Sequence, residues 1–216
     1  MATQRSPKLD KKQVVETALR LLNEVGLDGL TLRAIAKELN VQAPALYWHF
    51  KNKQALLDEM ATEMYRRMVA GAELPEGAAW QERIMSAQRG LRRALLGYRD
   101  GAKVFSGSRF TGTEHAVALE ANLRALVDAG FELSQAVRAL STAFLFTLGH
   151  VTEEQGVQPL PGERREGYDV EERAGRMTDF PLAAAAGAEL FQGFEEGFEE
   201  GIRLVVAGIE ARYGVA

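Results

Sequence analysis

Residues 30–57 read LTLRAIAKELNVQAPALYWHFKNKQALL and predict two short helices followed by the start of a longer one. Thr31 stands where a helix N-cap belongs, because its hydroxyl can accept a hydrogen bond from a free backbone N–H of the helix that turns Ile35 inward. Asn40 tolerates the left-handed conformation that ends such a helix. Pro44 then suits the first turn of a second helix, where the N–H that proline lacks is not needed.

The second short helix, Ala43–Phe50, is too polar and aromatic to be simply core. It carries Tyr47, Trp48 and His49 near its end, and lysines follow at positions 51 and 53. A helix with small residues first and phosphate-binding groups at its end is suited to lie in the major groove of DNA. The alternative is an ordinary helical hairpin whose aromatic side chains fill a core.

The segments on either side complete a small helical head. Upstream, residues 9–25 repeat apolar side chains at spacings of three and four, and Gly26 supplies the residue after the helix end. Downstream, Asn52 can cap a long helix, Lys53–Ala70. The apolar face of the upstream helix consists of Val14, Ala18, Leu21, Leu22 and Val25.

The rest of the chain has helical spacing and no alternating strand pattern, so the predicted fold class is all-α. The stretch Gly156–Phe180 combines prolines and a run of charges with few apolar residues, which predicts a mobile loop. The helices expected beyond residue 70 are Trp80–Tyr98, Gly101–Phe105, Thr113–Ala129, Ser134–Glu154 and Leu182–Tyr213.

Formal charge divides the chain into a basic head and an acidic body. Residues 1–53 carry nine Lys and Arg against five Asp and Glu, a balance of +4, and the remaining residues carry −8. A basic end on an acidic body is typical of a protein that contacts a polyanion at one end only. Chance scatter of surface charge is the alternative explanation.

Composition and motifs argue against several classes of protein. The chain has no cysteine, so disulfides, a cysteine nucleophile and thiolate metal sites are excluded. No nucleophile–base arrangement and no glycine-rich phosphate loop is present, so we do not expect an enzyme. No signal peptide or apolar run long enough to cross a membrane is found, so we expect a cytoplasmic protein without a membrane partner.

The last predicted helix has an apolar stripe and a second face without side chains. Gly193, Gly197 and Gly201 recur every four residues, and glycine inside a helix costs roughly 1 kcal/mol relative to alanine. We expect another helix backbone to approach there, in a homodimer that pairs this helix and Ser134–Glu154 with their symmetry mates. Packing on the core of the same chain is the alternative. The stripe consists of Phe191, Phe194, Phe198, Ile202, Val205 and Ile209.

These motifs resemble the tetracycline-repressor (TetR) family of regulators, whose recognition helix commonly ends in Tyr-x-His-Phe before a lysine. The similar segments are LLNEVGLDGLTLR, LYWHFKNKQALLD, WQERI, ALLGYRDGAKV and FTLGHVTEEQ, and they indicate the tetracycline-repressor-like subgroup. The resemblance implies a helix-turn-helix DNA-binding domain, residues 1–52, and a ligand-binding and dimerisation domain, residues 53–216, with residues 53–70 as the connecting helix. It implies a repressor that binds double-stranded, palindromic operator DNA as a homodimer and is released by a small-molecule inducer. A regulator that has lost its ligand response is the alternative within this class, and a helical enzyme or a structural dimer is the alternative outside it.

The resemblance also assigns roles in DNA binding. Arg33 matches a base-reading arginine, and a guanidinium forked onto guanine is the commonest specific base contact. Lys53 matches a phosphate-binding lysine, which positions the protein without reading sequence. Ala43 and Ala45 replace a base-reading glutamine and threonine, so the operator is expected to differ from the tetracycline operator. The other DNA-facing positions are Pro44, Tyr47, Trp48 and His49.

The family's site for a drug–Mg²⁺ chelate is altered in this chain. Two histidines and an asparagine of that site correspond to Val69, Ala87 and Phe105, so the ion loses its direct protein ligand. We therefore expect no metal cofactor, and a flat or hydrophobic inducer. The residues expected to enclose it are Val69, Ala87, Leu91, Phe105, Phe110 and Phe144.

Polar residues beside this site are expected to complete it. Ser108 and Arg109 match retained polar positions. Glu153 matches an acidic residue that the family's site takes from the other subunit, and here it is expected to pair with Arg109 or to face water. A filled core that binds nothing specific is one alternative. A metal cluster of His115, His150, Glu153 and Glu154 is another, disfavoured because other nitrogen or sulfur ligands are lacking nearby.

Overall fold

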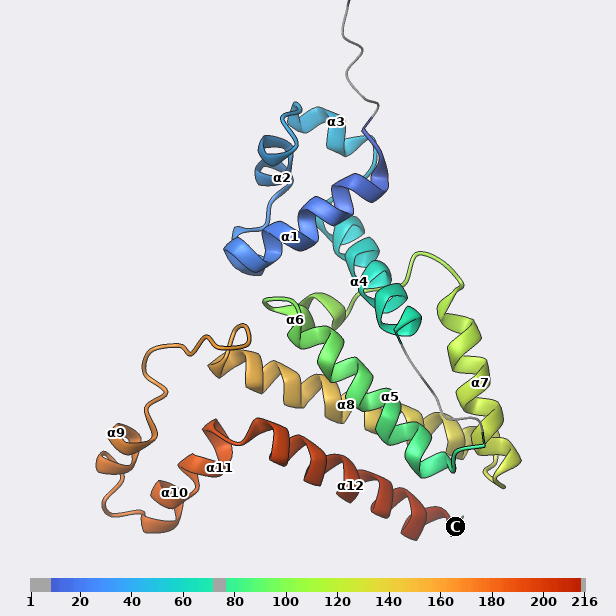
Figure 1. Ribbon diagram of the computed structural model, residues 1–216, viewed down its shortest axis with the longest axis vertical. Coiled ribbons are helices and arrows are strands. Elements are labelled where there is room, and N and C mark those ends of the chain that lie inside the picture. Colours follow the sequence, from blue (N-terminus) through green and yellow to red (C-terminus); the bar gives the residue numbers. More distant parts are fainter. Residues whose placement is uncertain (1–8, 72–76, 215–216) are drawn as a thin grey trace, which may run out of the picture.

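The computed structural model describes residues 9–71 and 77–214, and these residues form helices and no strands. The predicted all-α class is confirmed. Figure 1 shows a small head of three helices at one end, a long helix leading from it, and a larger body of helices below. The division of the chain between residues 52 and 53 stays a prediction.

The head consists of α1 (Lys11–Gly29), α2 (Leu32–Glu38) and α3 (Ala43–Tyr47). The predicted cap is confirmed, since the Thr31 Oγ accepts from the Ala34 N–H at 3.1 Å. Asn40 has the predicted left-handed backbone, with φ of 52°. The third helix is shorter than predicted and ends at Tyr47 rather than at Phe50.

The apolar face predicted for α1 is wrong at one residue, Val25. Val25 is 45% exposed, whereas Val14, Ala18 and Leu22 are fully buried. Val25 is the last residue before the kink at Gly26, where φ is 70° and ψ is 177°, so the regular helical face ends at this position.

Helix α4 (Lys53–Ala70) begins at the predicted cap, where Asn52 Oδ1 accepts from the Ala55 N–H at 2.9 Å. Its buried residues join the core of the head to that of α5 (Trp80–Leu96), α6 (Gly101–Phe105) and α8 (Leu133–Val157). One continuous apolar core therefore runs from the head into the body. Its members include Leu22, Ile35, Leu46, Phe50, Met60, Leu91, Phe105 and Val151.

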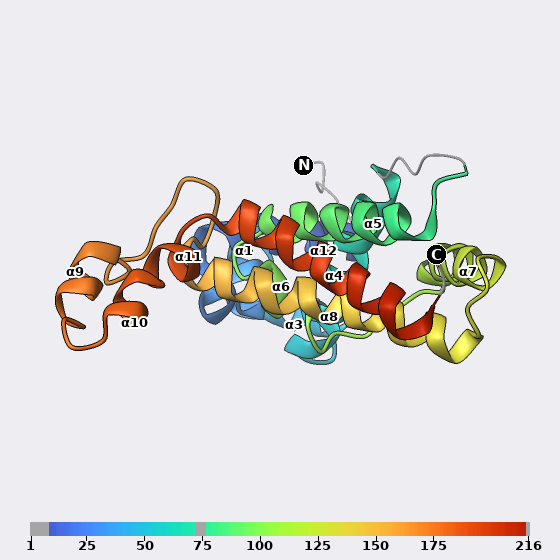
Figure 2. The same ribbon diagram turned by 90° about the horizontal axis from the view of Figure 1, so that it is seen from below.

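A second core lies between α5, α7 (His115–Asp128), α8 and α12 (Phe194–Tyr213). Trp80 packs edge-on against Phe131, with ring centroids 5.0 Å apart. Figure 2 shows α8 and α12 lying side by side along the body, and this pair of helices has extensive contact. The buried residues of α12 in this core are Phe198, Ile202, Val206 and Ile209.

The C-terminal third differs from the prediction in its helix bounds. The predicted helix Leu182–Tyr213 is divided into α10 (Pro181–Ala185), α11 (Gly187–Phe191) and α12. The break falls at Gly193, whose φ is 58°, so this glycine lies before α12 and not inside it. The predicted loop 156–180 contains the short helix α9 (Val170–Gly175), while its mobility stays a prediction.

The close approach predicted at the α12 glycines is made within the same chain, by a side chain. A Cβ built on Gly201 would lie 2.4 Å from the Phe146 ring of α8, and one on Gly197 would lie 3.7 Å from His150. The expected approach of another helix backbone at these two glycines is therefore wrong. The alternative, packing on the chain's own core, describes this face of α12.

Candidate DNA-binding surface and ligand cavity

Helix α3 presents aromatic side chains to the outside of the head. Trp48 is 90% exposed and Tyr47 is 54% exposed, whereas Leu46 and Phe50 are buried. The two buried positions are four residues apart, so one side of this segment anchors it in the core and the other is exposed. The alternative in which Tyr47 and Trp48 fill the core is contradicted by this exposure.

The remaining predicted DNA-binding residues surround this face. Arg33 is exposed in the first turn of α2, and Pro44 is exposed in the first turn of α3. Ala43, Ala45 and His49 are half-buried.

Lys53 makes a contact that sequence reasoning did not foresee. Its Nζ donates to the Leu27 carbonyl at 2.7 Å, which ties the start of α4 to the end of α1. The predicted phosphate ligand is therefore engaged within the head when no DNA is present.

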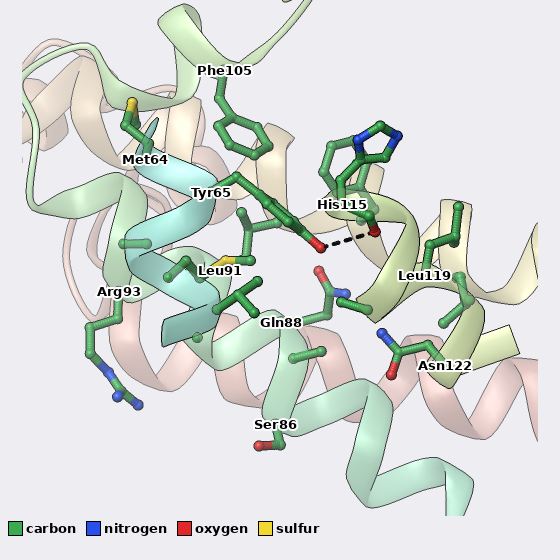
Figure 3. A pocket seen from close by; sticks show the side chains of 18 of the residues that line it. Met64, Tyr65, Ser86, Gln88, Leu91, Arg93, Phe105, His115, Leu119 and Asn122 are labelled. Atoms are coloured by element: carbon green, nitrogen blue, oxygen red, sulfur yellow. Dashed lines mark hydrogen bonds between the residues drawn. The ribbon is translucent and has the colours of Figure 1, made fainter. Parts of the chain in front are cut away.

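A cavity of about 1050 Å³ lies in the body between α4, α5, α7 and α8, with α6 at one side. Figure 3 shows side chains from these elements directed into it. The six residues predicted to enclose the inducer all line this cavity, namely Val69, Ala87, Leu91, Phe105, Phe110 and Phe144.

Three residues predicted for the ligand site are not in the cavity wall. Ser108 donates its hydroxyl to the Val104 carbonyl at 2.6 Å. Arg109 is exposed, and its backbone N–H donates to Asp58 Oδ1 at 3.0 Å. Glu153 is exposed on α8, and among the described residues no ion pair joins it to Arg109. Ser108 and Arg109 therefore lie in the turn after α6, outside the wall of this cavity, whereas the role of Glu153, expected at the site of a second subunit, stays a prediction.

Aromatic rings form one end of the cavity. Phe105 contacts Phe110 edge-on at 5.5 Å between ring centroids and lies 6.3 Å from Phe144. Tyr65 lies 4.8 Å from Phe110, and its hydroxyl donates to the His115 carbonyl at 3.5 Å. Burial raises the pKa of Tyr65, so this hydroxyl remains protonated near neutral pH.

Sequence reasoning missed several polar residues of the cavity wall, among them Tyr65, Gln88, His115 and Asn122. The Nδ1 of His115 is buried without a hydrogen-bond partner among the described residues. One signal was available for Gln88. It stands on α5 in line with the buried residues Ile84, Leu91 and Leu95, so it is a polar residue within an apolar stripe.

Behind the cavity, a buried ion pair joins α5 to α8. Arg92 donates from Nε and one terminal nitrogen to the two carboxylate oxygens of Glu154, at 3.0 and 2.8 Å. His150 lies beside this pair, and its Nε2 donates to the Phe194 carbonyl at 2.9 Å. Burial lowers the pKa of His150. Within the described residues, no group of three or more His, Asp or Glu side chains is arranged to hold a metal ion.

Two sets of contacts connect the cavity region to the head. Arg67, which lines the cavity, forms an ion pair with Glu16 of α1 and donates to the Tyr98 hydroxyl at 3.1 Å. Asn23 of α1 donates to the Gly97 carbonyl at 3.2 Å and accepts from the Arg99 N–H at 2.9 Å. A change in the cavity wall can therefore reach α1 through direct contacts.

The described helices were also tested as membrane spans. None combines the length and apolar character needed to cross a bilayer.

Comparison with known proteins gives two family matches. The description "Bacterial regulatory proteins, tetR family" matches residues 14–60, and "Tetracyclin repressor-like, C-terminal domain" matches residues 73–213. The chain is 41% identical over 209 residues to the tetracycline repressor protein class A from transposon 1721 of Escherichia coli, covering 95% of this chain and 92% of the relative.

Two solved structures with a bound partner are also similar. A variant of TetR from Acinetobacter baumannii AYE in complex with minocycline has a TM-score of 0.73 at 35% identity, over 95% of this chain and 99% of that one. BioQ bound to its double-stranded DNA operator has a TM-score of 0.65 at 30% identity, over 94% of this chain and 99% of that one.

An exposed helix-turn-helix joined to a helical body with an apolar cavity defines a ligand-responsive, DNA-binding regulator of transcription. The matches identify the group within this class. The chain belongs to the TetR family of bacterial regulatory proteins, whose members are regulators and not enzymes.

Proposed function

We propose that this protein is a homodimeric repressor that binds a palindromic operator through α2 and α3 and releases it when an aromatic or hydrophobic inducer enters the cavity. The observation that carries the proposal is the exposure of Tyr47, at the end of α3, and of Trp48, directly after it, beside the buried Leu46 and Phe50. A regulator of this kind acts on DNA in the cytoplasm.

Operator binding is assigned to the exposed side chains of the head. Arg33 reads guanine, and Tyr47, Trp48 and His49 contact the groove and its edges, with Pro44 beside them. Lys53 binds a phosphate after leaving the Leu27 carbonyl. Ala43 and Ala45 can contact a thymine methyl but cannot pair with adenine as a glutamine does, so the preferred operator differs from the tetracycline operator.

Dimerisation is assigned to the outer face of α8 and α12. Leu145 and Leu204 are 64% and 65% exposed there, and a groove of about 310 Å³ runs past Thr142, Leu204 and Gly208. Exposed leucines beside helical glycine favour close packing of a second pair of helices, and a two-fold axis would bring the same face of a second copy onto it.

The drug–Mg²⁺ chelate that the family resemblance implies does not fit the residues of this cavity. Phe105 is buried and edge-on to Phe110, so its position offers a ring in place of a metal ligand. Val69 and Ala87 supply no polar atom, and Ser108 and Arg109 lie outside the wall. The inducer that we propose is therefore bound without Mg²⁺, by apolar and aromatic contact.

Induction follows from the position of α4. This helix begins in the head at Lys53 and reaches the cavity at Val69, while Arg67 connects the cavity wall to Glu16 of α1. Two recognition helices must lie about 34–36 Å apart to enter successive major grooves. An inducer that binds better to a state with another spacing weakens operator binding by that difference in affinity.

The test is binding to the promoter region beside the protein's own gene, measured at several salt concentrations. A repressor that contacts several phosphates loses affinity steeply as salt rises. Binding that is absent or independent of salt would refute the proposed function. Binding that no aromatic compound releases would support the alternative regulator without a ligand response.

A further inference from the structure

Gln88 is a buried amide in an apolar setting. It is 6% exposed on α5 and shares the buried stripe of Ile84, Leu91 and Leu95. Burying an amide costs free energy unless its polar atoms find hydrogen-bond partners. Both the carbonyl oxygen and the amide nitrogen of Gln88 therefore need hydrogen-bond partners.

The carbonyl end of Gln88 is held by Thr147 of α8. The Thr147 hydroxyl, which is fully buried, donates to Gln88 Oε1 at 2.9 Å. The Ala143 carbonyl is also within 3.0 Å of this hydroxyl, but it already accepts the helical N–H four residues on. The Thr147 hydroxyl therefore stabilises the structure more when it donates to the Gln88 carbonyl, because that carbonyl has no other donor among the described residues.

This contact directs the amide nitrogen of Gln88 toward the cavity. Gln88 is part of the cavity wall, and its Nε2 makes no hydrogen bond with any described residue. This nitrogen is not fully shielded from solvent, as expected for a group that borders open space. Figure 3 shows the amide directed into the space framed by Tyr65, His115 and Asn122.

We infer that Gln88 selects the inducer, by donating its amide N–H to a hydrogen-bond acceptor on an aromatic ligand. The inference rests on the proposed function and names the chemistry of its ligand, which is a planar aromatic molecule with a carbonyl or similar acceptor on its buried edge. Thr147 is a positioning residue, because it fixes the orientation of the amide and does not line the cavity.

Three planar probes of nearly the same shape test this inference. Fluorenone carries a carbonyl acceptor, carbazole carries an N–H donor, and fluorene carries neither. Their affinities for the full-length protein are measured by equilibrium dialysis. Since a neutral hydrogen bond is worth a modest net amount, we expect fluorenone to bind roughly threefold to tenfold more tightly than fluorene, and carbazole to gain nothing.

Variants separate the role of Gln88 from general packing. Gln88→Leu should bind fluorene at least as well as the wild type does and should lose the preference for fluorenone. Gln192→Leu makes the same chemical change at an exposed site outside the cavity and should keep the wild-type preference. Thr147→Val leaves Gln88 in place and should reduce the preference, which provides a test if Gln88→Leu fails to fold.

The outcomes distinguish this inference from the proposed function. A preference for carbazole in the wild type would mean that the amide carbonyl faces the cavity and would overturn the inference. A preference for fluorenone that survives Gln88→Leu would overturn it as well. If no probe binds while the same preparation binds promoter DNA in a salt-dependent way, the inference fails and the DNA-binding part of the proposed function stands.

Discussion

Trp48 and Phe105 are both large aromatic residues, and their surroundings give them opposite roles. Trp48 is 90% exposed on the head, where burial on contact with DNA would recover apolar surface now in water. Phe105 is 6% exposed and packs against Phe110 and Phe144 at the cavity. Under the proposed function, the same chemical type would serve DNA recognition at Trp48 and enclosure of the cavity at Phe105.

The proposed function assigns sequence-specific operator binding above all to Arg33. We expect Arg33→Ala to weaken specific binding by about 1–3 kcal/mol, because a forked contact to guanine is lost. Binding to unrelated DNA should fall much less, and thermal stability should hold because the side chain is exposed. Fluorescence anisotropy with both DNAs measures the difference. Arg124→Ala, at an exposed site on α7, is the control, and equal loss in the two variants would contradict the assignment.

His150 gives stability a pH dependence of predictable sign. Burial lowers its pKa in the folded state below the ordinary value of 6.5, so the unfolded chain takes up a proton first as pH falls. The contribution of neutral His150 to the free energy of unfolding is complete above pH 6.5 and is lost as the pH falls below that value. Chemical denaturation of the wild type between pH 7 and pH 5 should show this loss.

His150→Gln is the matched variant for that measurement. Glutamine can keep a hydrogen bond to the Phe194 carbonyl but does not titrate, so the variant should lose less stability over the same interval. The other charged groups around the site, Arg92, Glu154 and Glu195, are common to both proteins. If the wild type and His150→Gln lost the same stability over this pH interval, His150 would not be the source of the pH dependence.

Individual residues were predictable from sequence where the chemistry is local. Thr31, Asn40 and Asn52 act on backbone atoms within a few residues, and all three were placed correctly. Gln88 was not, because its partner Thr147 lies on another helix 59 positions away. The contact of Lys53 with Leu27 was missed for the same reason.

At the scale of helices, amphipathic spacing predicted the elements near the cavity well. Helices α4, α5, α6, α7 and α8 were expected within a few residues of their ends. The C-terminal prediction was wrong because glycines every four residues fit a helical pattern, whereas Gly193 adopts a left-handed backbone and separates α11 from α12. Periodicity alone does not distinguish a glycine inside a helix from one that precedes it.

The contact between α12 and α8 predicts the effect of one added methyl group. Gly201→Ala would place its Cβ 2.4 Å from the Phe146 ring, which is stacked on Phe198 and has little freedom to move. We expect a loss of about 1–3 kcal/mol in the free energy of unfolding, through overpacking. Denaturant titration measures it.

Gly90→Ala is the matched control for this change. Gly90 lies inside α5, and no atom is within 4 Å of its built Cβ, so alanine should be neutral or stabilising there by up to about 1 kcal/mol. If Gly201→Ala were as stable as Gly90→Ala, the packing of α12 on Phe146 would be weaker than described.

At the scale of the whole molecule, the decisive feature is the outer face of α8 and α12. Leu204→Arg places a charge on the exposed part of this face, where it should block a second copy without disturbing the core beneath. We expect the variant to be folded and monomeric by analytical ultracentrifugation, and to bind a palindromic operator much more weakly than the wild type.

Val117→Arg tests whether that effect is specific. Val117 is 75% exposed on α7, away from the α8 and α12 face, so this variant should remain dimeric. A dimeric Leu204→Arg protein with normal operator binding would place the dimer interface elsewhere. The sequence alone indicated pairing through the last helix but could not separate the face of α12 used within the chain from the face left outside.

The hydrogen bond from Lys53 to the Leu27 carbonyl also bears on how tightly the head holds DNA. A lysine that moves from this carbonyl to a phosphate exchanges one hydrogen-bond acceptor for another. It therefore adds less to the free energy of DNA binding than a lysine that was previously surrounded by water. The exchange leaves the end of α1 without its donor, next to the Asn23 contact with the body. With the proposed phosphate contact, operator binding and the fit between head and body would be linked at the ammonium group of Lys53.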